Sequence, residues 1–595
     1  MFKIKLSGFF IAIFLTIPQA TFSSEGQLLE LEKLVITKEK QFLLNVYGTS
    51  PDQSKAFDYQ SSLENLSNLP VDLQSRSLRS AIQTDFSLRG CTFQQVLILL
   101  NGHRINDPQT AHHNSDIPFT KEDIENIDVI PGASSSLFGP DAIGGAINFK
   151  LEEPLEKKII LESAAGNNRN GYGLFSISDK FKDLGYRLSI EDAQSAGFRY
   201  DTDFKKFTTS LAASLQLPDG KWENNFGYQE KEFGAYDFYT PGLGYPSWER
   251  TKTYLINSAV DLNNDGFLMK PSFLWRRHFD KFALRRTIPS YNDHRTDIYT
   301  PGIYLQKEAK FLGRVGLGLE WSGERITSTN LGRHNRSYNS IFLDDNVEIG
   351  RNLDLSFSLR RDDFSDFNTV YTGSGSAKFK LMDNIALNLG VCRTMRIPSF
   401  TELYYNDSTT IGNSDLAPEK SWNYQAGFEY GSKEFSSGLV FFFRRECQMI
   451  DWVKSDASQK WQAINFTRDN VFGIEYSMHK NINNLLSLDS NYAYTDKSID
   501  NQGYLYKYGP NYARHLVNTV FNLNLPFGAQ EIGFSYKKRP GRRGWVLMNA
   551  GLNFCLNKNL KIFLNSTNIL NIEYQDIAGI PQPGRYIESG LRTEW

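Results

Sequence analysis

Beyond about residue 157 the chain alternates apolar and polar residues with a period of two. In residues 353–360, leucine or phenylalanine alternates with aspartate, serine or arginine. The same order recurs in residues 315–322, 385–391, 548–554 and 587–595. Side chains of a β-strand point to opposite faces in turn, so the pattern predicts strands with one apolar face and one wet face.

The first quarter of the chain has a different texture. Residues 125–149 carry the glycines 132, 139, 144 and 145 and end in a run of small residues. Residues 86–107 contain the apolar run 96–100 followed by Asn101-Gly102. Glycine makes tight turns at little steric cost, so we expect these two stretches to form paired strands of a small globular domain.

Shorter elements are predicted inside this domain. Ser61 precedes leucines at helical spacing and Pro70 ends them, which predicts a capped helical segment. The polar loop 107–117 is expected to be exposed. Its pair His112-His113 is a metal-ligand candidate, but adjacent residues rarely face one metal, so we favour exposed loop histidines.

The N-terminus predicts export. Residues 1–23 combine Lys3 and Lys5 with a short apolar core and a small-residue end, the pattern of a secretory signal peptide. The polar arm 24–41 follows, interrupted by the β-prone segment Leu34, Val35, Ile36 and Thr37. That segment could add as a strand to the sheet edge of another protein, or it could be the first strand of the next domain. The residues of the arm alone do not decide between these two interpretations.

Composition and length limit the possible architectures of the chain. The net charge is −2, which indicates no nucleic-acid partner, and aromatic residues make up 14% of the chain. The segment 153–595, at roughly 20 residues per tilted strand and connection, gives about 22 strands, with long aromatic segments alternating with short breaks. We therefore predict an all-β transmembrane barrel of antiparallel strands whose lumen is closed by an N-terminal α+β plug domain at 42–152.

The sequence contains few signs of a catalytic or metal-binding site. No GxSxG, HExxH or GxGxxG motif is present, and the four scattered cysteines are expected to be unpaired. The chain is therefore predicted not to be an enzyme and to need no cofactor. The run 261–266 begins like a calcium loop but reads better as a hairpin turn. Asp201, Asp203 and Asp237 are acidic calcium candidates in external loops.

Five segments in order carry a family resemblance. They are EKLVITK (32–38), FSLRG with VLILLNGHRIN (86–106), GASSSLFGPDAIGGAINF (132–149), NSDLAPEKSWNYQAGFEY (413–430) and NILNIEY with PQPGRYIESGLRTEW (568–595). Together they resemble TonB-dependent outer-membrane receptors, nearest to the cobalamin-receptor subgroup. Pro131 departs from this pattern, because the family usually has an arginine there, which puts a plug–barrel ionic lock at that point in doubt; Arg89 is kept.

The resemblance implies a mechanism. Leu34, Val35, Ile36 and Thr37 would form the TonB box and pair with the TonB C-terminal domain by strand addition. Cargo would bind outside, between barrel loops and the plug apex. The predicted apex ligand residues are Arg104, Asn106, Gln109, His112 and His113. A monomer is expected in the outer membrane of a diderm bacterium, exported through the Sec pathway and surrounded by lipid and lipopolysaccharide.

The cargo is expected to be a corrinoid or a small-molecule metal chelate. No histidine stands between Arg396 and Asn413, where a haem receptor of the family would carry one. Energised import of cobalamin is favoured, and import of a ferric siderophore is the alternative. A non-energised docking barrel is the hypothesis from another class.

Overall fold

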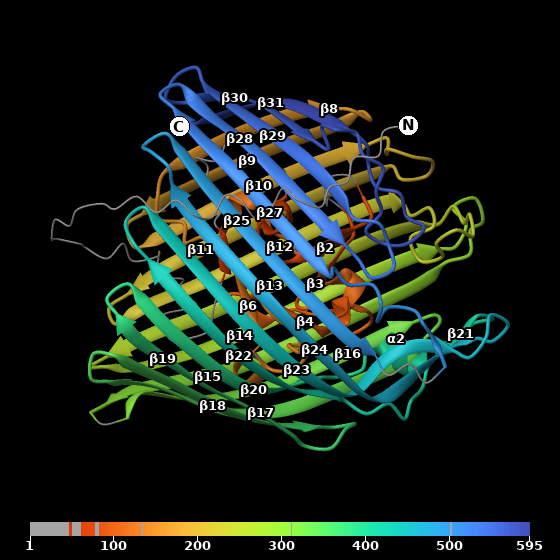
Figure 1. The fold of residues 1–595 in the computed structure, drawn as a ribbon, viewed down its shortest axis with the longest axis horizontal. Helices are drawn as coiled ribbons and strands as arrows, with labels where there is room; N and C mark the ends of the chain where they lie inside the picture. Colours follow the sequence, from red (N-terminus) through yellow and green to blue (C-terminus); the bar gives the residue numbers. More distant parts are fainter. Residues whose placement is uncertain (1–46, 50–60, 78–81, 133–134, 311, 500–502) are drawn as a thin grey trace, which may run out of the picture.

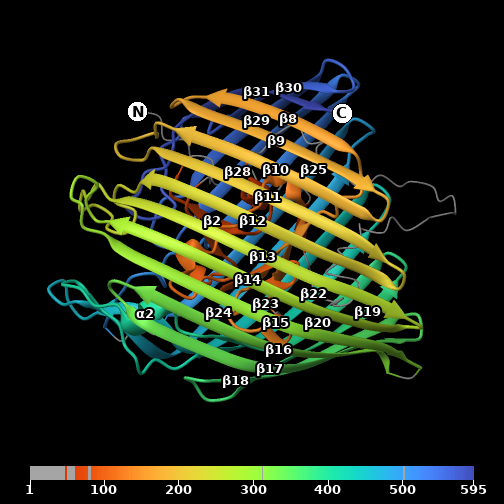
Figure 2. The same cartoon turned by 180° about the vertical axis from the view of Figure 1, so that it is seen from behind.

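The computed structural model describes residues 47–49, 61–77, 82–132, 135–310, 312–499 and 503–595. The predicted signal peptide and the TonB-box segment 34–37 lie outside these residues. Strands in the described part form a closed antiparallel barrel of 22 strands, which surrounds an N-terminal plug (Figures 1 and 2). The predicted fold class is confirmed.

The plug consists of short strands and turns of helix. Its strands are β1 (Tyr47–Thr49), β2 (Asp72–Ser75), β3 (Thr84–Ser87), β4 (Val96–Leu100), β5 (His103–Arg104), β6 (Ile124–Pro131) and β7 (Gly145–Leu151). Its helical segments are η1 (Ser62–Asn68), η3 (Phe93–Gln95), η4 (Ala111–His113), η5 (Lys121–Asp123) and α1 (Ser135–Phe138). The helix predicted after Ser61 forms as a 3-10 helix, and Ser61 Oγ accepts a hydrogen bond from the Leu63 amide at 3.3 Å.

The central plug sheet has the order β1-β6-β7-β4-β5. β7 pairs parallel to β4 and antiparallel to β6, so the two glycine-bordered stretches are neighbours, as predicted. The run Val96–Leu100 is apolar on both faces because both are covered. One face packs on the barrel residues Leu255, Leu274 and Ile298, and the other packs on Tyr304 and Phe342.

Glycine is required where β7 begins. Gly145 has φ +130°, and a Cβ there would lie 2.3 Å from the carbonyl oxygen of Ile130. The turn Asn101-Gly102 has φ values of 48° and 81°, which is the two-residue hairpin turn that its sequence predicts. These turns bring β4, β6 and β7 into one sheet.

The barrel strands alternate in direction around the wall. In order they are β8 (Lys158–Gly166), β9 (Asn170–Phe181), β10 (Leu184–Ser195), β11 (Phe204–Leu217), β12 (Gly220–Gly234), β13 (Trp248–Asn264), β14 (Phe267–Ala283), β15 (Asn292–Ala309), β16 (Gly313–Ser328), β17 (Gly332–Ile349), β18 (Leu353–Phe364), β19 (Val370–Met382), β20 (Ile385–Arg396), β22 (Glu419–Gly431), β23 (Phe435–Lys454), β24 (Trp461–Asn481), β25 (Leu486–Ile499), β27 (His515–Leu525), β28 (Gly528–Lys538), β29 (Trp545–Cys555), β30 (Leu560–Thr567) and β31 (Tyr586–Glu594).

The two ends of the barrel differ. Connections at one end are short, such as 182–183, 218–219 and 265–266, whereas connections at the other end include 235–247 and 397–418. The longest carries α2 (Phe400–Tyr404) and β21 (Thr410–Ile411), and β26 (Leu505–Tyr506) lies in another. Figure 1 shows α2 and β21 at the end opposite the C-terminus. The predicted asymmetry of short turns and long loops is confirmed.

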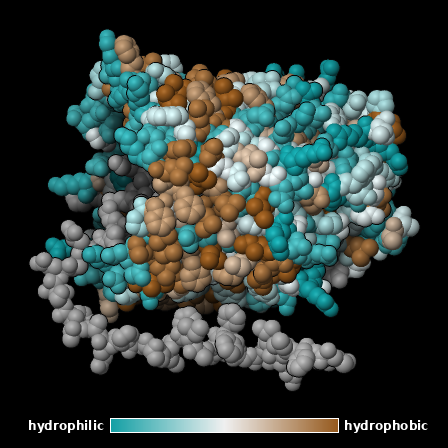
Figure 3. Space-filling view, turned by 90° about the horizontal axis from the view of Figure 1, so that it is seen from above, coloured by the Kyte–Doolittle hydropathy of each residue, from teal (hydrophilic) through white to brown (hydrophobic). Residues whose placement is uncertain are grey.

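On the barrel strands the apolar residues face outward and the polar residues face the lumen. On β18, Phe357 and Leu359 are 51% and 68% exposed, whereas Ser358 and Arg360 between them are 3% and 2% exposed. The apolar face therefore points away from the molecule and the polar face points to the plug. Figure 3 shows hydrophobic residues gathered in a band across the face in view, with hydrophilic residues on either side. This is the surface of a barrel that meets lipid.

The barrel closes by pairing its first and last strands. β31 pairs antiparallel to β8, with Glu588 opposite Gly166 and Glu594 opposite Ile160. The turn Asp265-Gly266 joins β13 to β14 with φ values of 47° and 75°, so the calcium-like run 261–266 is a hairpin, as predicted. No helix in the described part of the chain is long and apolar enough to cross a membrane.

Candidate functional site between plug and barrel

The loop 107–117 lies against the inner wall of the barrel. Asp107 binds Arg276 of β14 and accepts a hydrogen bond from Thr296 of β15 at 3.1 Å. Asp116 accepts from Lys231 of β12 at 2.8 Å. Burial acts to raise the pKa values of these two carboxylates. Arg276 nevertheless holds the pKa of Asp107 below its usual range, and Lys231 does the same for Asp116.

The predicted exposure of this loop is wrong. His112 is 7% exposed and His113 is 3% exposed. His112 Nδ1 lies 2.9 Å from Asp85, while His113 Nε2 lies 3.4 Å from Asp280 on β14. The histidines are buried because carboxylates far away in the sequence face them. As expected for adjacent residues, the two side chains reach different partners.

The environments of the two histidines differ in their electrostatics. Burial lowers the pKa of His112 from its ordinary value, and the Asp85 carboxylate only partly opposes this effect. Burial also acts to lower the pKa of His113, but the bond to Asp280 and the surrounding carboxylates raise it to about 10. His113 therefore carries a proton in this arrangement at neutral pH, whereas His112 does not.

The other three predicted apex residues are also buried. Arg104 bridges Asp141 of the plug at 2.6 Å and Glu324 of β16 at 2.6 Å, and both carboxylates raise its pKa against burial. Asn106 Oδ1 accepts from the Ile98 amide at 2.7 Å, and its amide donates to the Val96 carbonyl at 3.0 Å.

Gln109 donates to Asp280 at 2.8 Å, beside His113. The structure thus brings Gln109 and His113 together and places Arg104, Asn106 and His112 elsewhere. Their role in ligand binding stays a prediction.

An aromatic cluster of plug and loop residues lies beside His112. The His112 ring stacks on Phe93 with centroids 4.2 Å apart, and Tyr508 meets Phe93 edge-on at 5.1 Å. Tyr239 lies 5.8 Å from His112 and donates to Glu249 at 2.5 Å. Phe93, Tyr239 and Tyr508 were not among the site residues predicted from the sequence. The aromatic richness of segment 233–250 was the available signal for Tyr239.

Charged contacts join the plug to the wall all around the lumen. Arg89 binds both carboxylate oxygens of Glu475 at 3.0 and 2.7 Å and donates to Gln425 at 3.0 Å. A Cβ at Gly132, next to Pro131, would lie 3.3 Å from Arg89 Nη1. Pro131, where the family usually carries an arginine, is therefore close to Arg89, and Arg89 itself makes an ion pair between plug and barrel.

Similar contacts are found at other points of the interface. They are Asp72–Arg539, Lys121–Glu162, Arg592–Glu122 and Arg187–Asp123. Each pair joins one plug residue to one buried residue of the barrel chain. Together with the apolar contacts of β4 on the wall, such pairs fix the position of the plug.

The calcium candidates already have partners in the protein. Arg286 binds Asp201 at 2.9 Å and Asp203 at 2.6 Å. Asp237 accepts backbone hydrogen bonds from its own loop, including one from Gly244 at 2.7 Å. A calcium ion would have to displace the guanidinium of Arg286, so calcium binding at these residues stays a prediction.

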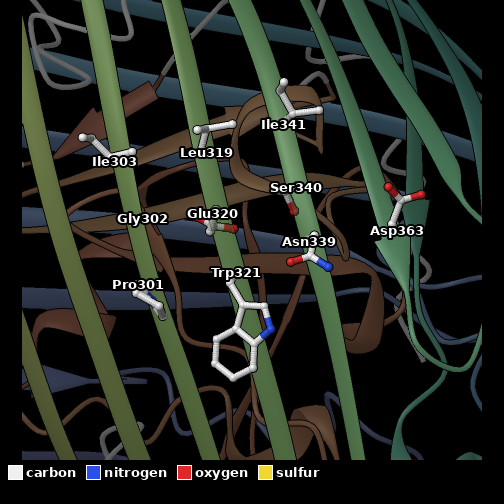
Figure 4. Close-up of a pocket in the computed structure, with 10 residues that line it drawn as sticks. All are labelled: Pro301, Gly302, Ile303, Leu319, Glu320, Trp321, Asn339, Ser340, Ile341 and Asp363. Atoms are coloured by element: carbon white, nitrogen blue, oxygen red, sulfur yellow. The ribbon is translucent and has the colours of Figure 1, made fainter.

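Two hollows differ in what they face. A cavity of about 200 Å³ separates η1 and β2 of the plug from β27–β30, and Lys537, Trp545 and Tyr574 are among its lining residues. The hollow in Figure 4, about 520 Å³, lies across β15–β18, where Ile303, Leu319 and Ile341 form a row beside Gly302. Leu319 and Ile341 are exposed on the lipid-facing side, so this second hollow is not a place for a water-soluble cargo.

All four cysteines are among the described residues, and none forms a disulfide, as predicted. Cys91 and Cys392 are buried. Burial raises the pKa of the Cys91 thiol to about 12, so it stays protonated and packs as a small apolar group.

A lipid-facing barrel with a docked plug and long loops at one end defines a class: the plugged transporters of the bacterial outer membrane. Two family models match the barrel and the plug separately. A model described as "TonB dependent receptor-like, beta-barrel" matches residues 158–569, and "TonB-dependent Receptor Plug Domain" matches residues 45–146. The chain belongs to the TonB-dependent receptor family, whose members are outer-membrane transporters and not enzymes.

Comparison with individual proteins gives low identities over long stretches. The chain is 24% identical over 529 residues to the vitamin B12 transporter BtuB of Photobacterium profundum, covering 82% of each chain. Among solved structures it is similar to the siderophore receptor PirA of Pseudomonas aeruginosa (TM-score 0.75, 16% identity, 93% of this chain and 100% of that one). The ferric enterobactin receptor PfeA of the same species, solved with enterobactin, gives a TM-score of 0.77 at 15% identity, covering 93% of this chain and 100% of that one.

Proposed function

We propose that this transporter imports a corrinoid, with cobalamin as the favoured cargo. The observation that carries the proposal is the similarity to a vitamin B12 transporter over 82% of both chains. The siderophore receptors are similar at 13–16% identity, which supports the common fold and does not discriminate between cargoes. The cobalamin-like order of the plug motifs supports the same choice.

Cargo binding begins at the outer end of the plug. The aromatic rings of Phe93, Tyr239 and Tyr508 gather there beside His112. Rings at such a site can pack on a large flat ligand. Arg104, Asn106, Gln109, His112 and His113 hold protein groups in the ligand-free plug, so contact with cargo requires them to exchange those bonds for bonds to the ligand.

Energy for import comes from the periplasmic partner. In this proposal Leu34, Val35, Ile36 and Thr37 pair with a strand of the TonB C-terminal domain, which main-chain hydrogen bonds hold in register. Deleting residues 34–37 should leave cargo binding unchanged and abolish uptake. Unchanged uptake would instead favour a docking barrel that needs no energy.

A ligand comparison on purified protein tests the cargo. Cyanocobalamin and a panel of ferric siderophores are titrated by calorimetry against the full chain in detergent, with the metal-free siderophores as controls. The proposal expects saturable binding of cyanocobalamin only. Saturable binding of a ferric siderophore alone would replace cobalamin by the alternative cargo, and binding of neither would refute both.

A further inference from the structure

A cluster of buried carboxylates and histidines lies between the plug loop 107–117 and strands β13–β15. The strand register places Glu249 on β13, His278 and Asp280 on β14, and His294 opposite Asp280 on β15. His113 enters from the plug. All five side chains are at least nine-tenths buried. The polar inner face of the wall and the plug loop therefore contribute to one buried cluster.

The carboxylates in and beside this cluster differ in whether a cation lies next to them. Three neighbouring carboxylates each have a cation: Asp85 has Arg76, Asp107 has Arg276, and Asp116 has Lys231. Among the residues that the structure describes, Asp280 and Glu249 have no lysine or arginine partner. Asp280 faces His113 and Gln109, and Glu249 accepts a hydrogen bond from Tyr239.

Two buried carboxylates therefore share one imidazole and have no lysine or arginine beside them in the described residues. Burying an unpaired charge is costly, so such sites acquire a cation or a proton. Within the described part of the chain, Asp280 Oδ1 and Gln109 Oε1 are also buried without a hydrogen-bond partner. These oxygens are acceptors that a bound cation would satisfy.

The ligand atoms have the spacing of a metal site. One nitrogen of His113 and one oxygen each of Glu249 and Asp280 lie within 4.8 Å of one another. His113 Nε2 and Asp280 are 3.4 Å apart. Ligand atoms about 2.0–2.1 Å from a tetrahedral zinc ion are separated by about 3.3 Å, which agrees with this distance.

We propose that His113, Glu249 and Asp280 bind a divalent transition-metal ion of the Zn²⁺ type between plug and barrel wall. One imidazole nitrogen and two carboxylate oxygens suit such an ion, and Gln109 Oε1 or a water fills the fourth position. Because His113 belongs to the plug and the carboxylates belong to the wall, the bound ion fastens loop 107–117 to β13 and β14.

A second group of ligand-type residues is less suitable. His113, Asp116 and His278 also lie within 4.8 Å of one another. Asp116 is already neutralised by Lys231 at 2.8 Å, and His278 Nδ1 bonds Thr253 at 2.9 Å. A cation there would face the lysine ammonium, so the ion belongs to the set with Glu249 and Asp280.

The test uses the full chain purified in detergent, stripped with EDTA and titrated with ZnCl₂, with bound zinc counted by elemental analysis. We expect one zinc ion per chain. His113→Gln and Glu249→Gln should weaken binding by more than about 100-fold, since losing even an outer-shell partner costs about 10–100-fold. His479→Ala, at a half-exposed histidine of β24 paired with Asp489 of β25, should bind as the unmodified protein does.

A second measurement separates loss of binding from loss of folding. Glu249→Gln replaces a buried carboxyl group by a neutral amide of the same shape, so the zinc-free variant should melt at or above the temperature of the zinc-free parent. Zinc should raise the melting temperature of the parent and leave that of Glu249→Gln unchanged. Absence of bound zinc in the parent, or equal zinc stabilisation of both proteins, would overturn the proposal. Neither measurement requires transport, so the outcome is independent of the cargo.

Discussion

Arg89 offers the sharpest test of how the plug is held. Its guanidinium makes two hydrogen bonds to Glu475 and one to Gln425, and it lies 4.4 Å from the centre of the Phe442 ring. Arg89 and Glu475 side chains are only 3% and 4% exposed. Replacing Arg89 by alanine removes the cation and leaves the carboxylate in a site that water hardly reaches.

The expected cost is large. Breaking one side of a buried ion pair costs about 3–5 kcal/mol, because the remaining charge is still desolvated. An exposed ion pair is worth about 0–1 kcal/mol. The cost should be lower when both partners are removed, since Arg89→Ala with Glu475→Ala leaves no charge buried there. Arg89→Lys keeps the charge but loses the two-pronged geometry, and an intermediate cost is expected.

Hydrogen exchange of plug amides measured by mass spectrometry gives the free energy of local opening. In Arg89→Ala, peptides covering β3 and β4 should open about 3–5 kcal/mol more easily than in the parent, while barrel peptides distant from Glu475 stay unchanged. Arg361→Ala is the matched control, because the Arg361–Asp363 pair is half exposed on the outer wall. Equal protection in Arg89→Ala and Arg361→Ala would refute the reasoning that buried charge holds the plug.

Three further outcomes follow from the same contacts. The cations Arg539 and Lys537 lower the pKa of Asp72, although burial acts to raise it, so the stabilisation of the plug by ionised Asp72 is complete above about pH 4 and is lost as the pH falls further. The difference in hydrogen-exchange protection of the plug between the parent and Asp72→Asn should therefore shrink on acidification. A difference that stays constant with pH would contradict this. Gly145→Ala should cost the plug more than about 1–3 kcal/mol, from the positive φ and the clash with Ile130, while the barrel still resists heat on gels; normal plug exchange would argue against it. Leu359→Arg puts a charge on the lipid face and should destabilise the barrel by up to about 2–4 kcal/mol in urea refolding from lipid vesicles, and an unchanged midpoint would count against a lipid-facing wall there.

Local patterns predicted most of the fold. The alternation through Phe357 and Leu359, the Asn101-Gly102 turn and the Asp265-Gly266 turn each depend on neighbours in sequence, and each forms as expected. Period two alone does not say which face is inside. The lipid-facing direction followed from the strand count and from the need to fill a wide lumen.

The site could not be predicted in the same way. Loop 107–117 is polar, and polar loops are usually exposed; it is buried because Asp280 and Arg276 on the wall provide partners. Those partners lie more than a hundred residues further along the chain, and no local pattern links them to His113 or Asp107. The helical segment after Ser61 shows a smaller difference, since its cap was predictable but its 3-10 geometry was not.

The pairing of β8 with β31 has a consequence for biogenesis. β8 is the first barrel strand to be synthesised. Among the described strands it pairs with β9 and β31, so one edge of it stays without hydrogen-bond partners until β31 arrives. An open strand edge is a template for pairing with other chains. The sheet therefore passes through a stage at which a chaperone or an assembly machine has to shield that edge, and closure is the last step, at which the edge disappears.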